Sequence, residues 1–300
     1  MNLRDIGYFA VLAAHRHVGR AAEELDISQP ALSLSLRRLE KAMTAKLVKR
    51  TPKGVELTAT GAALLSRVSR LRLVHDDVAR EVADLAEGRS GSLRVGAHPG
   101  MVRDPLAGAT ASLLKEAPEL LLTVNVMDAD RLLPVLQAGE ADLILHEIPL
   151  APPSGIEQVY LFDDEVVVFS ASTHPLARRK RVALADLAQE RWALTESRGE
   201  TWLQLKRLLS NQGLPAPRVA VMTASLPLRD HLVARSLLLG ISSRRVLAQA
   251  ATRSGLAELR IPEARRARRV GASFRSDGYL SPAAGRFIKI LRATSKQPAP

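Results

Sequence analysis

The polar side chains between positions 29 and 38 carry the hydrogen-bonding groups that can read DNA bases. Gln29 can pair with adenine through two hydrogen bonds, Ser33 can bond to several bases, and an arginine can reach guanine or a phosphate. A helix over this stretch would turn Leu34, Arg37 and Arg38 outward and leave Ser33 at the edge. Leu34 would then be available for the methyl group of a thymine. These residue types predict a helix that lies in the major groove of DNA.

The elements that must hold this helix are visible in the flanking sequence. The stretch Val18–Glu40 reads as two helices joined by a tight turn at Asp26 and Ile27. Ser28 stands where a helix N-cap belongs, because its hydroxyl can accept a free backbone N–H of the first turn. Pro30 falls in that first turn, where its missing N–H costs no hydrogen bond. The inner stripe of the second helix is Leu32, Leu36, Leu39 and Met43.

A pattern of this kind also has an ordinary explanation. Two amphipathic helices with a cationic face are most often a solvated helical pair. The residues that follow favour DNA binding, because Leu47–Thr58 contains two short β-prone pieces around a Pro-Lys-Gly turn, as in the wing of a winged helix. Arg50 and Lys53 would lie along phosphates or tip into a minor groove.

Residues 1–61 resemble the N-terminal domain of LysR-type transcriptional regulators. The matching residues are Phe9, Val11, Ala21, Ala22, Leu25, the run Ser28–Ser33, Leu39, Glu40, Leu47, Arg50, Leu57, Thr58 and Gly61. The resemblance implies a winged helix-turn-helix over residues 1–58, in which these residues contact DNA: Ser28, Gln29, Pro30, Ser33, Leu34, Arg37, Arg38, Arg50 and Lys53. Family members usually carry a polar or basic residue at the position of Leu34, so we expect an unusual base preference.

A long linker helix is predicted over residues 59–88. Its apolar positions alternate spacings of four and three, with His75 as the one polar member: Leu64, Val68, Leu71, His75, Val78, Val82 and Leu85. Such a heptad favours a homodimer, although a helix packed on its own domain explains it as well. In a dimer, each recognition helix would read half of an inverted repeat. We also expect the dimers to form a homotetramer.

From Ser92 onward strands alternate with helices, which predicts an α/β domain with a mainly parallel sheet. This region resembles the effector domain of the same family, a two-lobed module like type 2 periplasmic binding proteins. The segments that carry this resemblance include Gly91–Gly96, Leu136–Leu143 and His174–Ala177. Residues 92–162 plus 268–300 are expected to form lobe I and residues 163–267 lobe II. The crossovers are expected near Phe162-Asp163 and Arg266–Val270.

A small-molecule effector is expected between the lobes, where the carboxyl ends of the strands meet. The residues offered to this cleft are His98, Pro99, Gly100, Met101, Asp128, His146, Thr195, Ser197, Thr201 and Ser225. Thr201 and Ser225 lie near helix N-termini, which favour an anionic ligand. The alternative is that these are loop residues without a ligand, with His98 and His146 as a surface pair.

Composition narrows the possible classes of protein. The chain has no cysteine, no signal-peptide pattern and no apolar run of membrane-spanning length, so we expect a cytoplasmic protein without membrane contact. The net charge is +12, but residues 1–58 supply only +4 of it, whereas residues 163–265 carry +6 and residues 266–300 carry +7. The total charge therefore does not itself indicate DNA binding.

The sequence argues against two functions other than that of a DNA-binding regulator. An enzyme is disfavoured because the sequence has no Gly-x-Ser-x-Gly elbow, no glycine-rich phosphate loop and no histidines at metal-ligand spacing. We therefore predict no catalytic residue, no cofactor and no metal site. A solute-binding protein of the transport kind would need export. The sequence does not determine the effector, the operator, the regulated genes, whether the protein activates or represses, or whether it is a dimer or a tetramer.

Overall fold

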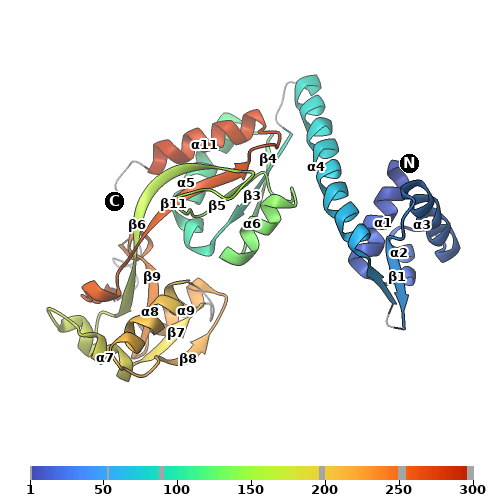
Figure 1. Cartoon of the computed structure of the whole chain (residues 1–300). Coiled ribbons are helices and arrows are strands. Elements are labelled where there is room, and N and C mark those ends of the chain that lie inside the picture. Colours follow the sequence, from blue (N-terminus) through green and yellow to red (C-terminus); the bar gives the residue numbers. More distant parts are fainter. Residues whose placement is uncertain (1, 53, 88–90, 196–199, 249–254, 296–300) are drawn as a thin grey trace. The chain divides into compact units, whose positions relative to one another are not determined.

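The computed structural model describes residues 2–52, 54–87, 91–195, 200–248 and 255–295. The chain divides into two compact units, residues 1–83 and residues 84–300. One helix, α4 (Ala59–Glu87), belongs to the first unit over most of its length and ends in the second (Figure 1). None of the described helices is long and apolar enough to cross a lipid bilayer.

The first unit is a winged helix-turn-helix, as the sequence predicts. Its helices before α4 are α1 (Leu3–His15), α2 (Val18–Glu24) and α3 (Gln29–Met43), and its wing is the antiparallel pair β1 (Val48–Thr51) and β2 (Gly54–Leu57). Phe9, Leu32 and Leu39 are fully buried and fix how α1 and α3 pack. Burial of side chains of this size contributes about 1.5–3 kcal/mol each. The inner stripe of α3 is therefore confirmed.

Local chemistry sets the corner and the wing of this unit. Ser28 Oγ accepts a hydrogen bond from the backbone N–H of Ala31 at 3.3 Å, so the predicted N-cap is present. Gly54 opens β2 at a φ of +130°, and a Cβ there would lie 2.3 Å from the carbonyl oxygen of Arg16. The next residue, Val55, donates its N–H to that same oxygen at 2.8 Å. Only glycine allows this approach, which ties the wing to the end of α1.

The predicted seam of α4 divides into two parts. Leu64 and Val68 pack into the core of the first unit, as in a helix packed on its own domain. Farther along, Leu71, Val78 and Val82 are half exposed or more, and Leu85 is 77% exposed. An apolar stripe at heptad spacing thus remains uncovered on the distal half of the helix.

The second unit is built on one mixed sheet of nine strands in the order β4-β3-β5-β11-β6-β9-β7-β8, with β10 paired to β6. The strands are β3 (Ser92–Ala97), β4 (Leu121–Val126), β5 (Leu143–Glu147), β6 (Ile156–Ala171), β7 (Arg191–Leu194), β8 (Arg218–Met222), β9 (Leu238–Ser243), β10 (Leu256–Glu258) and β11 (Arg266–Arg275). Pairing is parallel among β3, β4 and β5 and among β7, β8 and β9. We call these groups lobe I and lobe II.

The prediction of a mainly parallel sheet is wrong at the centre. The long strands β6 and β11 pair antiparallel with each other and with their neighbours, and they run from one lobe into the other. Both predicted crossovers lie inside these strands, where Phe162 pairs with Val270 and Asp163 with Arg269. The polar residues within 157–165 hide the continuity of β6, which is why the sequence predicts a crossover there instead of one long strand.

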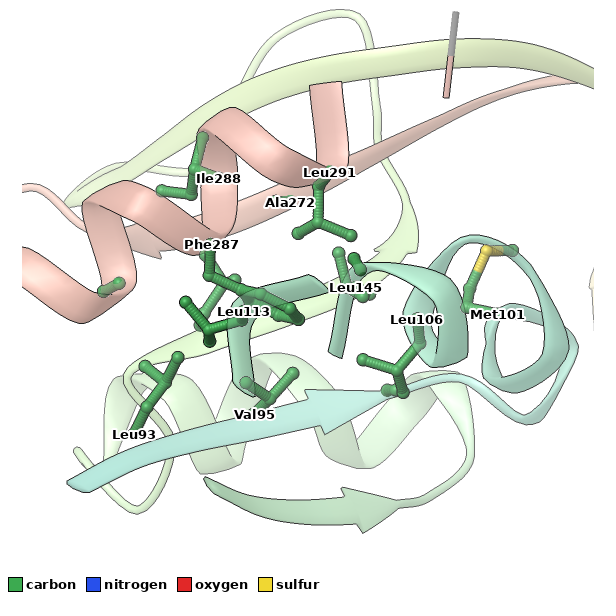
Figure 2. Close-up of a cluster of buried hydrophobic side chains, with 14 of the residues drawn as sticks. Leu93, Val95, Met101, Leu106, Leu113, Leu145, Ala272, Phe287, Ile288 and Leu291 are labelled. Carbon is green, nitrogen blue, oxygen red and sulfur yellow. The ribbon is translucent and has the colours of Figure 1, made fainter. Parts of the chain in front are cut away.

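Helices cover both faces of each lobe. They are α5 (Ala107–Glu116), α6 (Ala129–Gln137), α7 (Leu184–Gln189), α8 (Glu200–Asn211), α9 (Leu226–Ala234) and α11 (Pro282–Ser295). In lobe I, Phe287 and Leu291 of α11 pack with Leu113 of α5 against Val95 and Leu145 (Figure 2). Helix α6 covers the opposite face through its own cluster. This packing holds the strand ends that face the other lobe.

Candidate nucleic-acid interface and interlobe cleft

The outward face of α3 is open to solvent. Leu34 is 55% exposed, and Gln29, Pro30 and Arg37 are exposed as well, whereas Ser33 is half-buried. Within the described residues, the Arg37 side chain makes no recorded hydrogen bond or ion pair. A guanidinium in this state is available to a base edge or a phosphate without breaking an internal contact.

Arg38 is held by a carboxylate on α1. Its Nη2 donates to Oδ1 of Asp5 at 2.7 Å and its Nε donates to Oδ2 at 3.3 Å. Ser35 also donates to Asp5, whose residue is only 6% exposed. The hydrogen bond from Arg38 keeps the pKa of the Asp5 carboxyl below its usual value. Of the two α3 arginines predicted to reach DNA, Arg37 is therefore free to do so, and Arg38 joins α3 to α1.

The remaining predicted DNA contacts lie around this helix. Ser28 uses its hydroxyl as the N-cap of α3, Arg50 is exposed on β1, and Lys53 lies outside the described residues. The sequence reasoning missed the part played by Glu40, which is buried and accepts hydrogen bonds from the backbone N–H of Leu47 at 2.9 Å and from Lys46 at 2.7 Å. Glu40 thus fixes the start of the wing to the end of α3.

A cavity of about 290 Å³ lies between lobes I and II of the second unit. Four of the predicted residues line it: His98, Gly100, His146 and Thr195. The other lining residues include Trp202, Ser242 and Ser243, which the sequence reasoning did not select. The cavity is close to the lower end of the range for small-molecule sites.

Four predicted effector contacts do not line the cavity: Pro99, Met101, Asp128 and Ser225. Met101 is buried in the core of lobe I, and Ser225 caps α9 by accepting from the N–H of Leu228 at 3.3 Å. All four positions were predicted because they end strands or begin helices, but core packing occupies the side chain of Met101 and helix capping that of Ser225. Ser197 lies outside the described residues, and so does the side chain of Thr201, whose backbone is part of α8.

Three arginines in the cavity wall are the main residues missed by sequence reasoning. Arg229 donates to Asp230 at 2.7 Å and to the carbonyl oxygen of Ile241 at 2.6 Å. Arg266 and Arg268 come from the interior of β11 rather than from a strand end. They pair with carboxylates on neighbouring strands: Arg266 with Glu147 at 2.6 Å and Arg268 with Asp164 at 2.7 Å.

Both histidines of the cavity are neutral near pH 7. His98 Nδ1 accepts from the N–H of Gly100 at 3.1 Å, and His146 Nε2 lies 2.8 Å from Ser273 Oγ. Burial lowers the pKa of both imidazoles to about 4, and the charge of Arg268 adds to the effect at His98. The alternative of a surface pair is therefore wrong. Among the described residues, no group of three potential metal ligands is present.

A winged helix-turn-helix followed by a two-lobed α/β domain defines a class of bacterial transcriptional regulators. Residues 3–62 match the model of bacterial regulatory helix-turn-helix proteins of the LysR family, and residues 86–296 match the LysR substrate-binding domain. The chain therefore belongs to the LysR family of DNA-binding transcriptional regulators.

Curated relatives agree with this family. The small neutral protease regulatory protein of Streptomyces coelicolor is 34% identical over 226 residues, which cover 72% of this chain and 70% of that protein. The hydrogen peroxide-inducible genes activator of Pectobacterium carotovorum subsp. carotovorum is 34% identical over 197 residues. That match covers 65% of this chain and spans 65% of the activator's length.

Solved structures show the same fold. CbnR, a LysR family transcriptional regulator, matches with a TM-score of 0.64 at 21% identity, over 99% of this chain and 100% of that chain. A second CbnR structure, which holds its target DNA, gives 0.64 at 22% identity over 98% of this chain and 100% of that chain. A full-length OxyR variant from Pseudomonas aeruginosa gives 0.62 at 22% identity, over 100% of this chain and 96% of that one.

Proposed function

We propose that this protein regulates transcription by binding a specific operator through the outward face of α3. The observation that carries the proposal is the exposed, uncommitted Arg37 beside Leu34, on a helix whose inner face and Arg38 are fixed to α1. Gln29, Ser33 and Arg37 would contact base edges, and Arg50 with Lys53 would hold the phosphates. A regulator of this kind works in the cytoplasm, and the proposal assigns no catalytic step to any residue.

The assembly we propose is a homodimer formed through the distal half of α4, and two such dimers would form a homotetramer. The exposed stripe at Leu71, Val78, Val82 and Leu85 supports a partner helix, because an uncovered apolar heptad gains free energy when it is buried. Residues 1–58 would bind DNA and residues 59–88 would dimerise. Residues 92–162 with 268–300, and residues 163–267, would form the two effector lobes. Each half of an inverted repeat would then meet one α3.

The effector we propose is a small organic anion held in the interlobe cavity. Three guanidinium groups reach this cavity, together with two neutral imidazoles and the hydroxyl-bearing Thr195, Ser242 and Ser243. A ligand carboxylate can replace Glu147 on Arg266, because arginine binds carboxylates in the same forked geometry. Binding would then act on β11, which runs through both lobes, and a ligand that prefers one arrangement of the lobes shifts the population.

The first test is to incubate the purified full-length protein with sheared genomic DNA of its source organism and to sequence the retained fragments. We expect a small number of sharp sites that share an inverted repeat. Diffuse retention that disappears with moderate salt would mean electrostatic binding alone and would contradict operator recognition. The genes beside the sharp sites would supply the candidate anions for calorimetry.

A further inference from the structure

A basic surface outside the DNA-binding domain is the feature that the proposed function does not use. Four consecutive cations begin at the last residue of the short helical turn Pro175–Arg178 of lobe II: Arg178, Arg179, Lys180 and Arg181. All four side chains are exposed. In Figure 1 this segment leads into α7, at the end of lobe II that carries α7 and α8.

The four cations divide into two that are paired and two that are not. Arg179 forms an ion pair with Asp186 at 3.0 Å, and Arg181 forms one with Glu263 at 2.5 Å. These contacts tie the segment to α7 and to the turn before β11. The alternate residues Arg178 and Lys180 have no recorded ion pair or hydrogen bond within the described part of the chain.

A fifth cation comes from another segment of lobe II. The backbone N–H of Val182 donates to the carbonyl oxygen of Arg260 at 3.1 Å, which brings Arg260 beside the basic segment. Its side chain is exposed and also lacks a recorded partner among the described residues. We call Arg178, Arg179, Lys180, Arg181 and Arg260 the basic surface. Among the residues that the structure describes, two carboxylates pair with it, Asp186 and Glu263, so three of its cations are in excess.

Isolated surface cations are normally just solvated, but this arrangement has a property that suits a polyanion. Alternate residues of an extended chain lie at most about 6.6–7.2 Å apart, so Arg178 and Lys180 can neutralise separate charges along one strand of DNA. Backbone phosphates need no apolar contact, whereas protein interfaces have an apolar core. None of the exposed large apolar side chains of the described residues falls in segments 172–190 or 255–266.

We infer that the basic surface of lobe II binds the phosphate backbone of DNA, outside the operator that α3 reads. This inference rests on the proposed function, since it requires that the protein is brought to DNA by its N-terminal domain. The contact would carry no sequence information and would lengthen the DNA segment that the assembly protects. Residues 163–265 of lobe II carry a net charge of +6. Binding to phosphates would give this positive charge a function.

The experiment compares two DNA fragments with the full-length protein: the selected operator alone, and the same operator extended on each side by several helical turns. Affinity is measured by fluorescence anisotropy over a range of salt concentrations. The test variant is Arg178→Glu with Lys180→Glu. We expect it to lower the salt slope on the extended fragment by about 2, because each lost phosphate contact removes roughly 0.9 from the slope. On the operator alone we expect no change.

The matched control is Lys289→Glu with Arg292→Glu, which makes the same charge change on exposed residues of α11 in lobe I. A milder variant, Arg178→Gln with Lys180→Gln, guards against misfolding.

An equal loss of salt slope on the extended fragment in the test and control variants would mean that only net charge matters and would overturn the inference. An unchanged slope on the extended fragment, with loss of binding to polyglutamate instead, would assign the surface to an acidic protein. Failure of the wild-type protein to bind the operator alone would contradict the proposed function rather than this inference.

Discussion

Arginines serve opposite purposes at the two proposed binding sites of this protein. On α3, Arg37 is exposed and uncommitted, whereas its neighbour Arg38 pairs with the carboxylate of Asp5. In the interlobe cavity, Arg229, Arg266 and Arg268 each have an acidic partner already. The first surface is ready for a ligand as it stands. The second must exchange internal ion pairs before it can hold an anion.

This difference assigns separate roles to the two sites. A surface that breaks no contact on binding can recognise DNA with little rearrangement, so specificity follows from which side chains point outward. A cavity that must release Glu147 from Arg266 couples ligand binding to a change in strands shared by both lobes. Coupling of this kind is what an effector needs in order to shift a regulator between states.

The pH dependence of stability should show the largest difference between the two regions. Burial lowers the pKa of His98 and His146 from 6.5 to about 4, so between these pH values the unfolded chain binds protons that the folded chain does not. The stability that these residues contribute is present above pH 6.5 and is lost as the pH falls to about 4, with a slope of up to roughly 1.4 kcal/mol per pH unit for each histidine.

Tryptophan fluorescence follows this loss selectively, because both tryptophans, Trp192 and Trp202, lie in the second unit. In urea titrations, the free energy of unfolding of the wild type should fall steadily between pH 7 and pH 4.5. The control variant, His98→Asn with His146→Asn, keeps an acceptor for the Gly100 N–H and should flatten the profile. A wild-type profile as flat as that of the variant would contradict the burial of these imidazoles.

The next effect concerns the buried carboxylates of the two regions. Asp164→Asn should lower the free energy of unfolding by about 3–5 kcal/mol, because it leaves Arg268 as an uncompensated charge with a side chain only 8% exposed. Asp5→Asn should cost only about 1–3 kcal/mol, because Arg38 is 55% exposed and can turn to water. Urea unfolding of each variant gives these values. Equal losses would contradict the difference in burial between the cavity pair Arg268–Asp164 and the α3 pair Arg38–Asp5.

A smaller effect is expected from the two adjacent arginines of α3. Arg37→Ala should weaken operator binding by roughly 1–3 kcal/mol if it removes a base contact, and it should leave the melting temperature unchanged. Arg38→Ala should instead lower the melting temperature. It removes the hydrogen bond that Arg38 donates to Asp5 and leaves Ser35 as the remaining donor to that buried carboxylate. Anisotropy and thermal melting on both variants give the comparison. If Arg38→Ala weakened operator binding and Arg37→Ala lowered the melting temperature, Arg38 would be the DNA contact.

The smallest effect should come from Leu34. Because this side chain is half exposed, Leu34→Ala should change stability by less than about 0.5 kcal/mol. If Leu34 packs on a thymine methyl, the variant should lose roughly 1 kcal/mol of preference at one base pair. Selection of operators from a randomised pool reveals that loss. An identical preference for the two proteins would exclude the methyl contact.

Sequence reasoning succeeded where local signals decide the structure. The inner stripe of α3, the Ser28 cap and the glycine turn of the wing each depend on residues a few positions apart, and all three are present. In the cleft, His98 and His146 were found because they end strands, but Arg266 and Arg268 were not. Their position depends on β11 pairing with β5 and β6, which lie about a hundred residues or more away in the chain. No local pattern reports such pairing.

Operator recognition by α3 is tested most directly by measuring the affinity of the full-length protein for its selected operator and for a scrambled fragment of equal length, with wild type and Arg37→Ala, over a range of salt. We expect the wild type to prefer the operator by roughly a thousandfold or more. Arg37→Ala should lose affinity for the operator and keep its affinity for the scrambled fragment. Equal binding of the wild type to both fragments would contradict recognition by this helix.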